Sequence, residues 1–252
     1  MFSLKGRVAV VTGASSGLGL QMAQGFAEQG ADLVIMARRM ERLEVIAADF
    51  RSRGVRCLPI QCDVTNTEQI NRAAELAIEE YGKVDILVNN AGASKNAGVL
   101  EMTDEEWDFT MEADLTSVFK VTRAFAKYMV EKKYGRIINI ASIYGQVGNT
   151  AMDTVAYHSS KGGVINFTRA VAAELAKYNI TCNAISPGYF ETELTRDTLK
   201  TEAFTNFMKA SVPLGRYGNE GELNPIAVML ASDEASYITG QNIIVDGGYT
   251  SI

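Results

Sequence analysis

Tyr157 and Lys161 stand four residues apart in the stretch AYHSSKGG (156–163), which has the pattern of an amphipathic helix. Residues at positions i and i+4 lie on the same face of a helix, so the phenol and the ammonium group should be neighbours. A free tyrosine has a pKa of about 10, and a nearby cation favours its phenolate form. This pair could therefore pass a proton to or from an alcohol oxygen.

A proton-transferring tyrosine needs a second hydrogen-bonding group to hold the alcohol oxygen, and Ser142 is the candidate. It ends the apolar run GRIINIAS (135–142), and α/β sheets bind ligands outside the carboxyl ends of their strands. The chain has one histidine, His158, and three cysteines without a CxxC pair, so no metal site is predicted. No carboxylate marks His158 as part of a Ser-His-Asp mechanism, and we expect it at the surface or at an interface.

A glycine-rich turn, TGASSGLG, follows the first apolar run and opens a helical stretch, with Gly13, Gly17 and Gly19 in a G-x-x-x-G-x-G pattern. Glycines at this place allow a tight turn and let a pyrophosphate approach the N-terminus of the helix, where free N–H groups favour an anion. The alternative is a turn that is merely structural. The order strand, turn, helix, strand favours dinucleotide binding.

The second apolar run ends in MARRMERLE, where Arg38 and Arg39 occupy the place at which NAD-binding sites carry an acidic residue for the ribose 2′-hydroxyl. The nearest carboxylate is Glu41, and two cations suit a 2′-phosphate instead. The sequence therefore predicts that NADP(H) is preferred, with NAD(H) as the second option. Two alternatives are that the arginines only solvate the start of a helix or that one of them stacks on adenine.

Seven short apolar runs rich in β-branched residues alternate with helical stretches along the chain. They cover residues 7–12, 31–37, 55–64, 84–90, 135–142, 180–188 and 241–248. Runs that are apolar at successive positions suit strands buried on both faces, so we expect an α/β fold with a parallel sheet and helices on each side. No linker or repeat interrupts the alternation, which predicts a single domain over 1–252. The long connection at 189–219 follows a strand end, where substrate loops and lids occur.

Composition excludes several classes of partner. The 252 residues are 47% hydrophobic and 21% charged, with 24 basic and 30 acidic side chains and a net charge of −6. Because the acidic residues are scattered, no surface for nucleic acid or an anionic membrane is expected. The apolar run near the N-terminus is too short for a signal peptide or a membrane span, so a cytoplasmic protein is expected.

Several ordered motifs along essentially the whole chain resemble those of the short-chain dehydrogenases/reductases in their single-domain form. The motifs are TGASSGLG (12–19), DV (63–64), NNAG (89–92), IAS (140–142), YHSSK (157–161), SPGYFET (186–192) and VDGG (245–248). The resemblance implies a doubly wound, mainly parallel seven-stranded Rossmann sheet. It also implies an NAD(P)-dependent enzyme that interconverts a secondary alcohol and a ketone by hydride transfer.

By this resemblance Tyr157 is the general acid/base, Lys161 promotes its ionisation and binds the nicotinamide ribose, and Ser142 holds the substrate oxygen. The other implied contacts are to the cofactor. Gly13, Ser15, Ser16, Gly17, Leu18 and Gly19 would surround the pyrophosphate, Arg38 and Arg39 the adenosine ribose, Asp63 and Val64 the adenine, Asn89, Ala91 and Gly92 the adjoining ribose region, and Pro187, Gly188, Phe190 and Thr192 the nicotinamide.

Asp114 departs from the family pattern, which has an asparagine at this place to support a water that relays protons to the lysine. The matching segment here is MEADLTSVF. Aspartate is nearly isosteric with asparagine, but it cannot donate an amide hydrogen and it adds a negative charge near Lys161. We expect Asp114 to belong to the catalytic group and to change the pH profile.

Within the family, three segments most resemble the gluconate 5-dehydrogenase group, which interconverts gluconate and 5-ketogluconate. They are FSLKGRVAVVTG, SPGYFETELT and ITGQNIIVDGGYTSI. A polyol or keto acid is thus the expected substrate, and Lys95 could meet its carboxylate or could be a solvated loop lysine. The alternatives within the family are a 3-oxoacyl carrier-protein reductase and a hydroxysteroid dehydrogenase.

Two rivals belong to other classes: a non-catalytic NADP-sensing protein on the same fold, and an epimerase or dehydratase with tightly held NAD. The intact set of Ser142, Tyr157 and Lys161 argues against the first. The resemblance also implies a homotetramer whose subunit interface is formed by helices around 104–131 and 154–178.

Overall fold

The computed structural model describes residues 2–150, 152–192 and 195–252, without the side chains of residues 196 and 198, and is built on one parallel sheet. The strands are β1 (Val8–Thr12), β2 (Asp32–Ala37), β3 (Cys57–Gln61), β4 (Ile86–Asn89), β5 (Gly135–Ile140), β6 (Ile180–Pro187) and β7 (Asn242–Val245). Their order in the sheet is β3-β2-β1-β4-β5-β6-β7, and every pairing is parallel. The predicted fold class is therefore confirmed.

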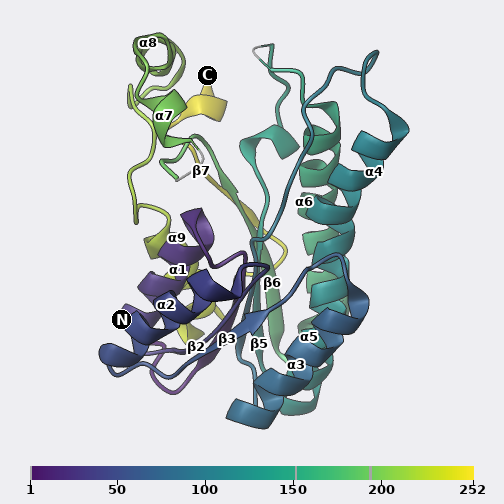
Figure 1. The fold of residues 1–252 in the computed structure, drawn as a ribbon, viewed down its shortest axis with the longest axis vertical. Helices are drawn as coiled ribbons and strands as arrows, with labels where there is room; N and C mark the ends of the chain where they lie inside the picture. The colour runs from purple at the N-terminus through teal and green to yellow at the C-terminus, as the bar shows by residue number, and fades with distance from the viewer. Residues whose placement is uncertain (1, 151, 193–194) are drawn as a thin grey trace.

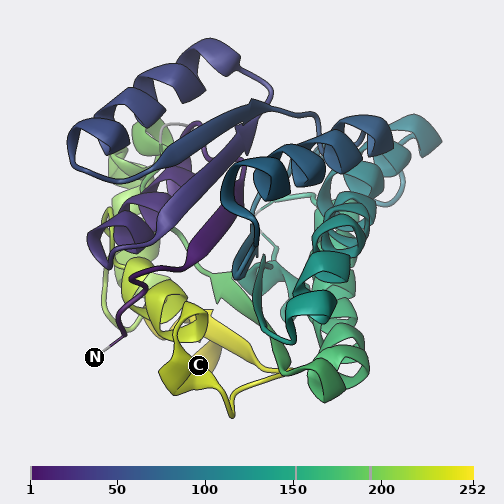
Figure 2. The same cartoon turned by 90° about the horizontal axis from the view of Figure 1, so that it is seen from below.

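Helices cover both faces of the sheet, which explains why the strands are apolar at successive positions (Figures 1 and 2). One face carries α1 (Gly17–Glu28), α2 (Met40–Ser52) and α9 (Asn224–Ala231), and the other carries α3 (Thr67–Tyr81), α5 (Ser117–Lys132) and α6 (Val155–Leu175). Within β1, Ala9 and Val11 join the first hydrophobic core, while Val8 and Val10 join the second. All four side chains are almost fully buried.

The remaining elements gather mostly beyond the carboxyl ends of the strands. They are α4 (Asp104–Met111), the π-helical turn η1 (Glu112–Thr116), α7 (Arg196–Leu199), α8 (Glu202–Ser211) and the 3-10 turns η2 (Ile143–Gly145), η3 (Ala176–Tyr178), η4 (Asp233–Ala235) and η5 (Tyr249–Ser251). The chain leaves β1 in one direction and returns to β4 on its other side, so a crevice opens where the order reverses.

Each of the seven apolar runs contains one strand, although the strands are shorter than the runs. In the predicted substrate segment 189–219, the structure has α7, α8 and a parallel bridge between Phe190 and Gly218; residues 193 and 194 lie outside the described part of the chain. The described residues contain no helix that is both long enough and apolar enough to span a membrane.

A buried polar network ties the middle of the sheet to two helices. Asn89 and Asn139 are paired across β4 and β5, and the Asn89 amide donates to Asn139 Oδ1 (2.8 Å) and to Thr122 Oγ1 on α5 (2.9 Å). The Asn139 amide donates in turn to Thr168 Oγ1 on α6 (2.9 Å). Since unpaired buried amides are costly, this network fixes α5 and α6 against the strands whose ends form the site.

Candidate active site

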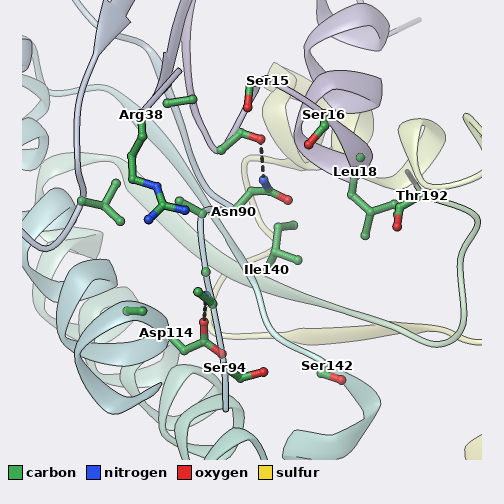
Figure 3. Close-up of a pocket in the computed structure, with 18 of the residues that line it drawn as sticks. Ser15, Ser16, Leu18, Arg38, Asn90, Ser94, Asp114, Ile140, Ser142 and Thr192 are labelled. Carbon is green, nitrogen blue, oxygen red and sulfur yellow. Dashed lines mark hydrogen bonds between the residues drawn. The ribbon is translucent and has the colours of Figure 1, made fainter. Parts of the chain in front are cut away.

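A cavity of about 1030 Å³ lies at the carboxyl edge of the sheet, over the ends of β1, β4 and β5. Figure 3 shows Ser15, Ser16 and Leu18 at one end of it and Asp114 and Ser142 at the other. All residues that the sequence proposed as catalytic or cofactor-binding border this cavity except Gly19, Asn89 and Phe190. Lys95, named as one option for a substrate contact, does not border it either. Its size suits a dinucleotide with a small substrate beside it.

The glycine-rich turn forms an anion cradle at the start of α1. Gly13 and Gly17 have positive φ angles of 68° and 59°, which only glycine adopts at low cost. Ser16, at the N-cap, makes no side-chain hydrogen bond to the helix, so the first N–H groups of α1 stay open to a ligand. These features fit the pyrophosphate of a dinucleotide.

Gly19 and Asn90 explain how the turn is held. A Cβ atom on Gly19 would lie 2.4 Å from Asn90 Nδ2, so only glycine permits this approach. The Asn90 amide donates to the carbonyl oxygens of Thr12 (3.0 Å) and Gly13 (3.4 Å), the second of which is drawn in Figure 3. Gly19 thus supports the turn by leaving room for the Asn90 side chain, and it does not border the cavity itself.

Asn89, which the resemblance places near a ribose of the cofactor, does not border the cavity. Asn89 is 3% exposed, and its amide points into the network with Asn139 and Thr122. Asn90, one residue later, borders the cavity instead. The reason is strand geometry, because successive side chains of a strand point to opposite faces. The doublet of asparagines in NNAG gave no sign of which one faces the cavity.

Phe190 is the other residue that does not border the cavity. Its side chain is 6% exposed and packs on Gly218, where an added Cβ would lie 2.5 Å from the ring. The neighbours Gly188 and Thr192 do border the cavity. Phe190 therefore anchors the segment after β6, and the sequence motif alone could not reveal this contact with a residue so much later in the chain.

Arg38 and Arg39 make the far end of the cavity cationic. Both border it, and Arg39 Nη2 donates to Ser15 Oγ at 3.4 Å. Asp63 on the same wall accepts from the backbone N–H and the hydroxyl of Thr65 (2.9 and 2.8 Å). These hydrogen bonds, with a smaller contribution from Arg38, hold the pKa of Asp63 below its ordinary value. Both guanidinium groups are exposed, so they can turn toward an anion that enters this end of the cavity.

Tyr157 and Lys161 share one face of α6, as their spacing predicts, and both border the cavity with Ser142. Lys161 Nζ lies 5.6 Å from the centre of the Tyr157 ring and donates to the carbonyl oxygen of Ile140 at the end of β5 (3.2 Å). Ser142 is 6% exposed, and its Oγ accepts from the Tyr144 N–H at 3.2 Å, which leaves its own hydrogen to donate. The three side chains thus bring an acid/base, a cation and a hydroxyl together.

Asp114 lies beside Lys161, as the sequence predicts. It belongs to the π-helical turn η1, is 1% exposed, and has its Oδ2 3.8 Å from Lys161 Nζ. Its Oδ1 accepts from the Ala93 N–H at 2.8 Å (Figure 3). Burial raises the pKa of Asp114 above its ordinary value, although Lys161 and the Ala93 and Ser160 donors oppose the rise. The side chain therefore keeps its proton to a higher pH than an exposed aspartate would.

Sequence reasoning missed two kinds of residue at this site. Asn90 and Ser94 border the cavity from the segment after β4. Tyr144 and Tyr189 lie behind the bordering residues, with their hydroxyl oxygens 2.5 Å apart and the Tyr144 ring in contact with Tyr157. Tyr144 stands two residues after Ser142, and Tyr189 stands one residue after Gly188. This closeness in sequence to predicted site residues is the signal that could have identified them.

Comparisons with known proteins agree with this geometry. The family model described as enoyl-(acyl carrier protein) reductase matches residues 13–250. The 3-oxoacyl-[acyl-carrier-protein] reductase of Thermotoga maritima is 37% identical, covering 97% of this chain and 98% of the relative. The 5-keto-D-gluconate 5-reductase of Escherichia coli is 36% identical, covering 98% and 97%.

A solved structure gives the same result. The gluconate 5-dehydrogenase of Burkholderia cenocepacia, in complex with NADP and tartrate, has a TM-score of 0.95 and 37% identity, covering 100% of this chain and 98% of that one. Fold, motifs and full-length similarity converge on one assignment. The chain belongs to the short-chain dehydrogenase/reductase family of oxidoreductases.

Proposed function

We propose that this oxidoreductase interconverts a secondary alcohol and a ketone with NADP(H) as its preferred cofactor, and that it acts on gluconate and 5-ketogluconate or on a related polyol or keto acid. One observation carries the proposal: Ser142, Tyr157 and Lys161 border one end of the cavity whose other end is the glycine-rich turn. A substrate held by Ser142 and Tyr157 would thus lie beside a dinucleotide held by the turn. We treat residues 1–252 as one catalytic domain, cytoplasmic in location.

A bound nicotinamide dinucleotide supplies the hydride for ketone reduction and accepts it in alcohol oxidation. In this proposal the Ser142 hydroxyl donates a hydrogen bond to the substrate oxygen and fixes its position. Tyr157 gives that oxygen its proton during reduction and takes it back during oxidation. Lys161 stabilises the ionised phenol through its positive charge.

The preference for NADP(H) is supported by Arg38 and Arg39, which border the cavity where an adenosine ribose would lie. Both side chains are exposed and free to adjust to a phosphate. The similar gluconate 5-dehydrogenase was solved with NADP.

Similar proteins include a reductase of 5-keto-D-gluconate and reductases of 3-oxoacyl carrier proteins, at nearly equal identity. Lys95 is exposed, with its Nζ 5.7 Å from the centre of the Phe109 ring, which favours a solvated loop lysine over a carboxylate anchor. We propose that the segment 189–219 forms the substrate loop.

The first prediction concerns the proton carrier. Tyr157→Phe should lower the turnover of NADPH oxidation by roughly 10²-fold or more and leave NADPH binding nearly intact, because it removes only the phenolic hydroxyl. Stopped-flow absorbance and NADPH fluorescence titration measure the two quantities. Tyr178→Phe is the matched control, since Lys177 Nζ lies 5.2 Å from that ring in a similar pair on another part of the chain. Turnover close to wild type in Tyr157→Phe would remove this residue from the mechanism.

The second prediction concerns cofactor choice. A charge-assisted contact to a phosphate is worth about 1.5 to 3 kcal/mol, so Arg38→Ala should raise the KM for NADPH at least about tenfold and change that for NADH little. Arg53→Ala, which alters an exposed arginine paired with Asp49, serves as the control. Equal losses with both cofactors would mean that Arg38 stacks on adenine, and a wild-type preference for NADH would refute the proposal.

The third prediction concerns Asp114 and the pH dependence of alcohol oxidation. Its negative charge, 3.8 Å from Lys161 Nζ, offsets part of the effect of the lysine on Tyr157. Asp114→Asn removes that charge and should move the alkaline-side pH midpoint of kcat/KM downward by on the order of one unit. Because burial raises the pKa of Asp114, its charge fades as pH falls, and the two profiles should converge on the acid side.

The control for this experiment is Asp108→Asn, which changes an exposed aspartate of α4. Profiles of wild type and Asp114→Asn that superimpose from about pH 6 to about pH 11 would show that Asp114 has only a structural role.

The fourth prediction concerns assembly, which we propose is a homotetramer with α4, α5 and α6 at the subunit interface. The large apolar side chains of Trp107 on α4 and Phe119 on α5 are 37% and 45% exposed, and covering them in a subunit interface would be favourable. Light scattering should give a mass of about four times the 27.4 kDa of one chain. A mass of one chain at assay concentration would contradict the proposal.

A further inference from the structure

Six aromatic side chains form a continuous series of ring contacts that begins at Tyr157, and we call them the aromatic wall. They lie behind the residues that border the cavity. They are Tyr144, His158, Tyr189, Phe204, Phe207 and Tyr249. They come from η2, α6, the segment after β6, α8 and η5, which are far apart in the chain. Tyr189, Phe204 and Phe207 lie in the proposed substrate loop, but no role has been given above to any of the six side chains.

The wall begins at the proposed proton carrier. The Tyr144 ring stands edge-on to Tyr157 at 6.4 Å and stacks on His158 at 4.8 Å. On the other side, the Tyr189 ring meets Phe204, Phe207 and Tyr249 edge-on at 5.3, 5.8 and 5.7 Å. Such packing fixes each ring in one orientation.

One hydrogen bond joins the two halves of the wall. The hydroxyls of Tyr144 and Tyr189 lie 2.5 Å apart, and either can be the donor. Tyr144 belongs to η2, the turn that follows Ser142, so this bond links the proposed substrate loop to that turn. In Figure 1, α7, α8 and the C-terminus stand on one side of the carboxyl edge and α6 stands on the other. Tyr189 directly follows the cavity residue Gly188, and Tyr144 stands two residues after the cavity residue Ser142.

The hydroxyl pair has hydrogen-bonding capacity left over. The Tyr189 hydroxyl also interacts with the Tyr249 hydroxyl, so three phenols hold three hydroxyl hydrogens and the two contacts between them use two. Burial raises the pKa values of Tyr144 and Tyr189, so both hydroxyls stay protonated and uncharged at working pH. The remaining donor and lone pairs suit an uncharged oxygen of a ligand. Apart from His158, the side chains of the wall carry no positively charged group that would favour an anion.

We propose that Tyr144 and Tyr189 are specificity-determining residues whose joined hydroxyls bind an oxygen that the substrate carries next to its reacting carbon. They would favour hydroxyketones and polyols over plain ketones of the same shape. This inference rests on the proposed function and narrows its substrate class. Because a site built to bind a hydroxyl leaves buried polar groups unpaired when that hydroxyl is missing, the discrimination can be large.

The test compares two ketones that differ by one group: hydroxyacetone, with a hydroxyl beside the carbonyl, and 2-butanone, with a methyl in its place. The wild type should have a higher kcat/KM for hydroxyacetone. Tyr144→Phe and Tyr189→Phe should each lower the ratio of the two kcat/KM values about tenfold or more, chiefly through hydroxyacetone. Their effects should not add in the double variant, because they share one hydrogen bond.

Tyr237→Phe is the control, since that ring is fully exposed, and it should leave the ratio unchanged. Two results would mean that the wall only packs α8 in place. One is equal kcat/KM values of the wild type for the two ketones, and the other is an equal fall of both kcat/KM values in the variants. If the wild type binds NADPH but reduces no ketone, the proposed function fails by itself. Calorimetric titration with D-gluconate then tests the proposed binding role of Tyr144 and Tyr189. About tenfold weaker binding of D-gluconate to Tyr144→Phe than to the wild type supports that role, and equal binding or no binding to either protein overturns it.

Discussion

The buried ammonium group of Lys161 is the constraint on which the rest of the site depends. It is 6% exposed, and a buried charge is tolerated only with partners that replace water. The Ile140 carbonyl accepts one hydrogen bond from it, and the Asp114 carboxyl group lies 3.8 Å away. These partners fix α6 against the end of β5 and against η1. Tyr157, one turn earlier on the same helix, is thereby set at the cavity wall.

Close packing around α6 makes this placement possible. A Cβ on Gly163 would lie 2.7 Å from the Leu115 side chain, and one on Gly145 would lie 2.7 Å from the Lys161 backbone. Deeper in the sheet, the amides of Asn89 and Asn139 hold α5 and α6 to β4 and β5. The polar interactions that position the reacting end thus include buried side chains of β4 and β5, whereas the glycine-rich turn depends mainly on backbone conformation at the start of α1.

Local patterns predicted most of this fold and much of the candidate site, and long-range contacts account for what they missed. Each apolar run contains a strand, and the i, i+4 spacing placed Tyr157 and Lys161 on one face because both signals are local. Choosing between Asn89 and Asn90 required the exact strand end, since one residue reverses the direction of a side chain. The hydroxyl contact of Tyr144 with Tyr189 joins residues 45 positions apart, which no periodicity reports.

The central claim is that this cavity brings a nicotinamide and a ketone together for direct hydride transfer. The most direct measurement uses NADPH that carries deuterium at both C4 positions, with 5-keto-D-gluconate or hydroxyacetone as the acceptor and mass spectrometry of the alcohol product. We predict one deuterium on the carbon that bears the new hydroxyl. Product without deuterium, or tightly bound cofactor that transfers none to either ketone, would contradict the account.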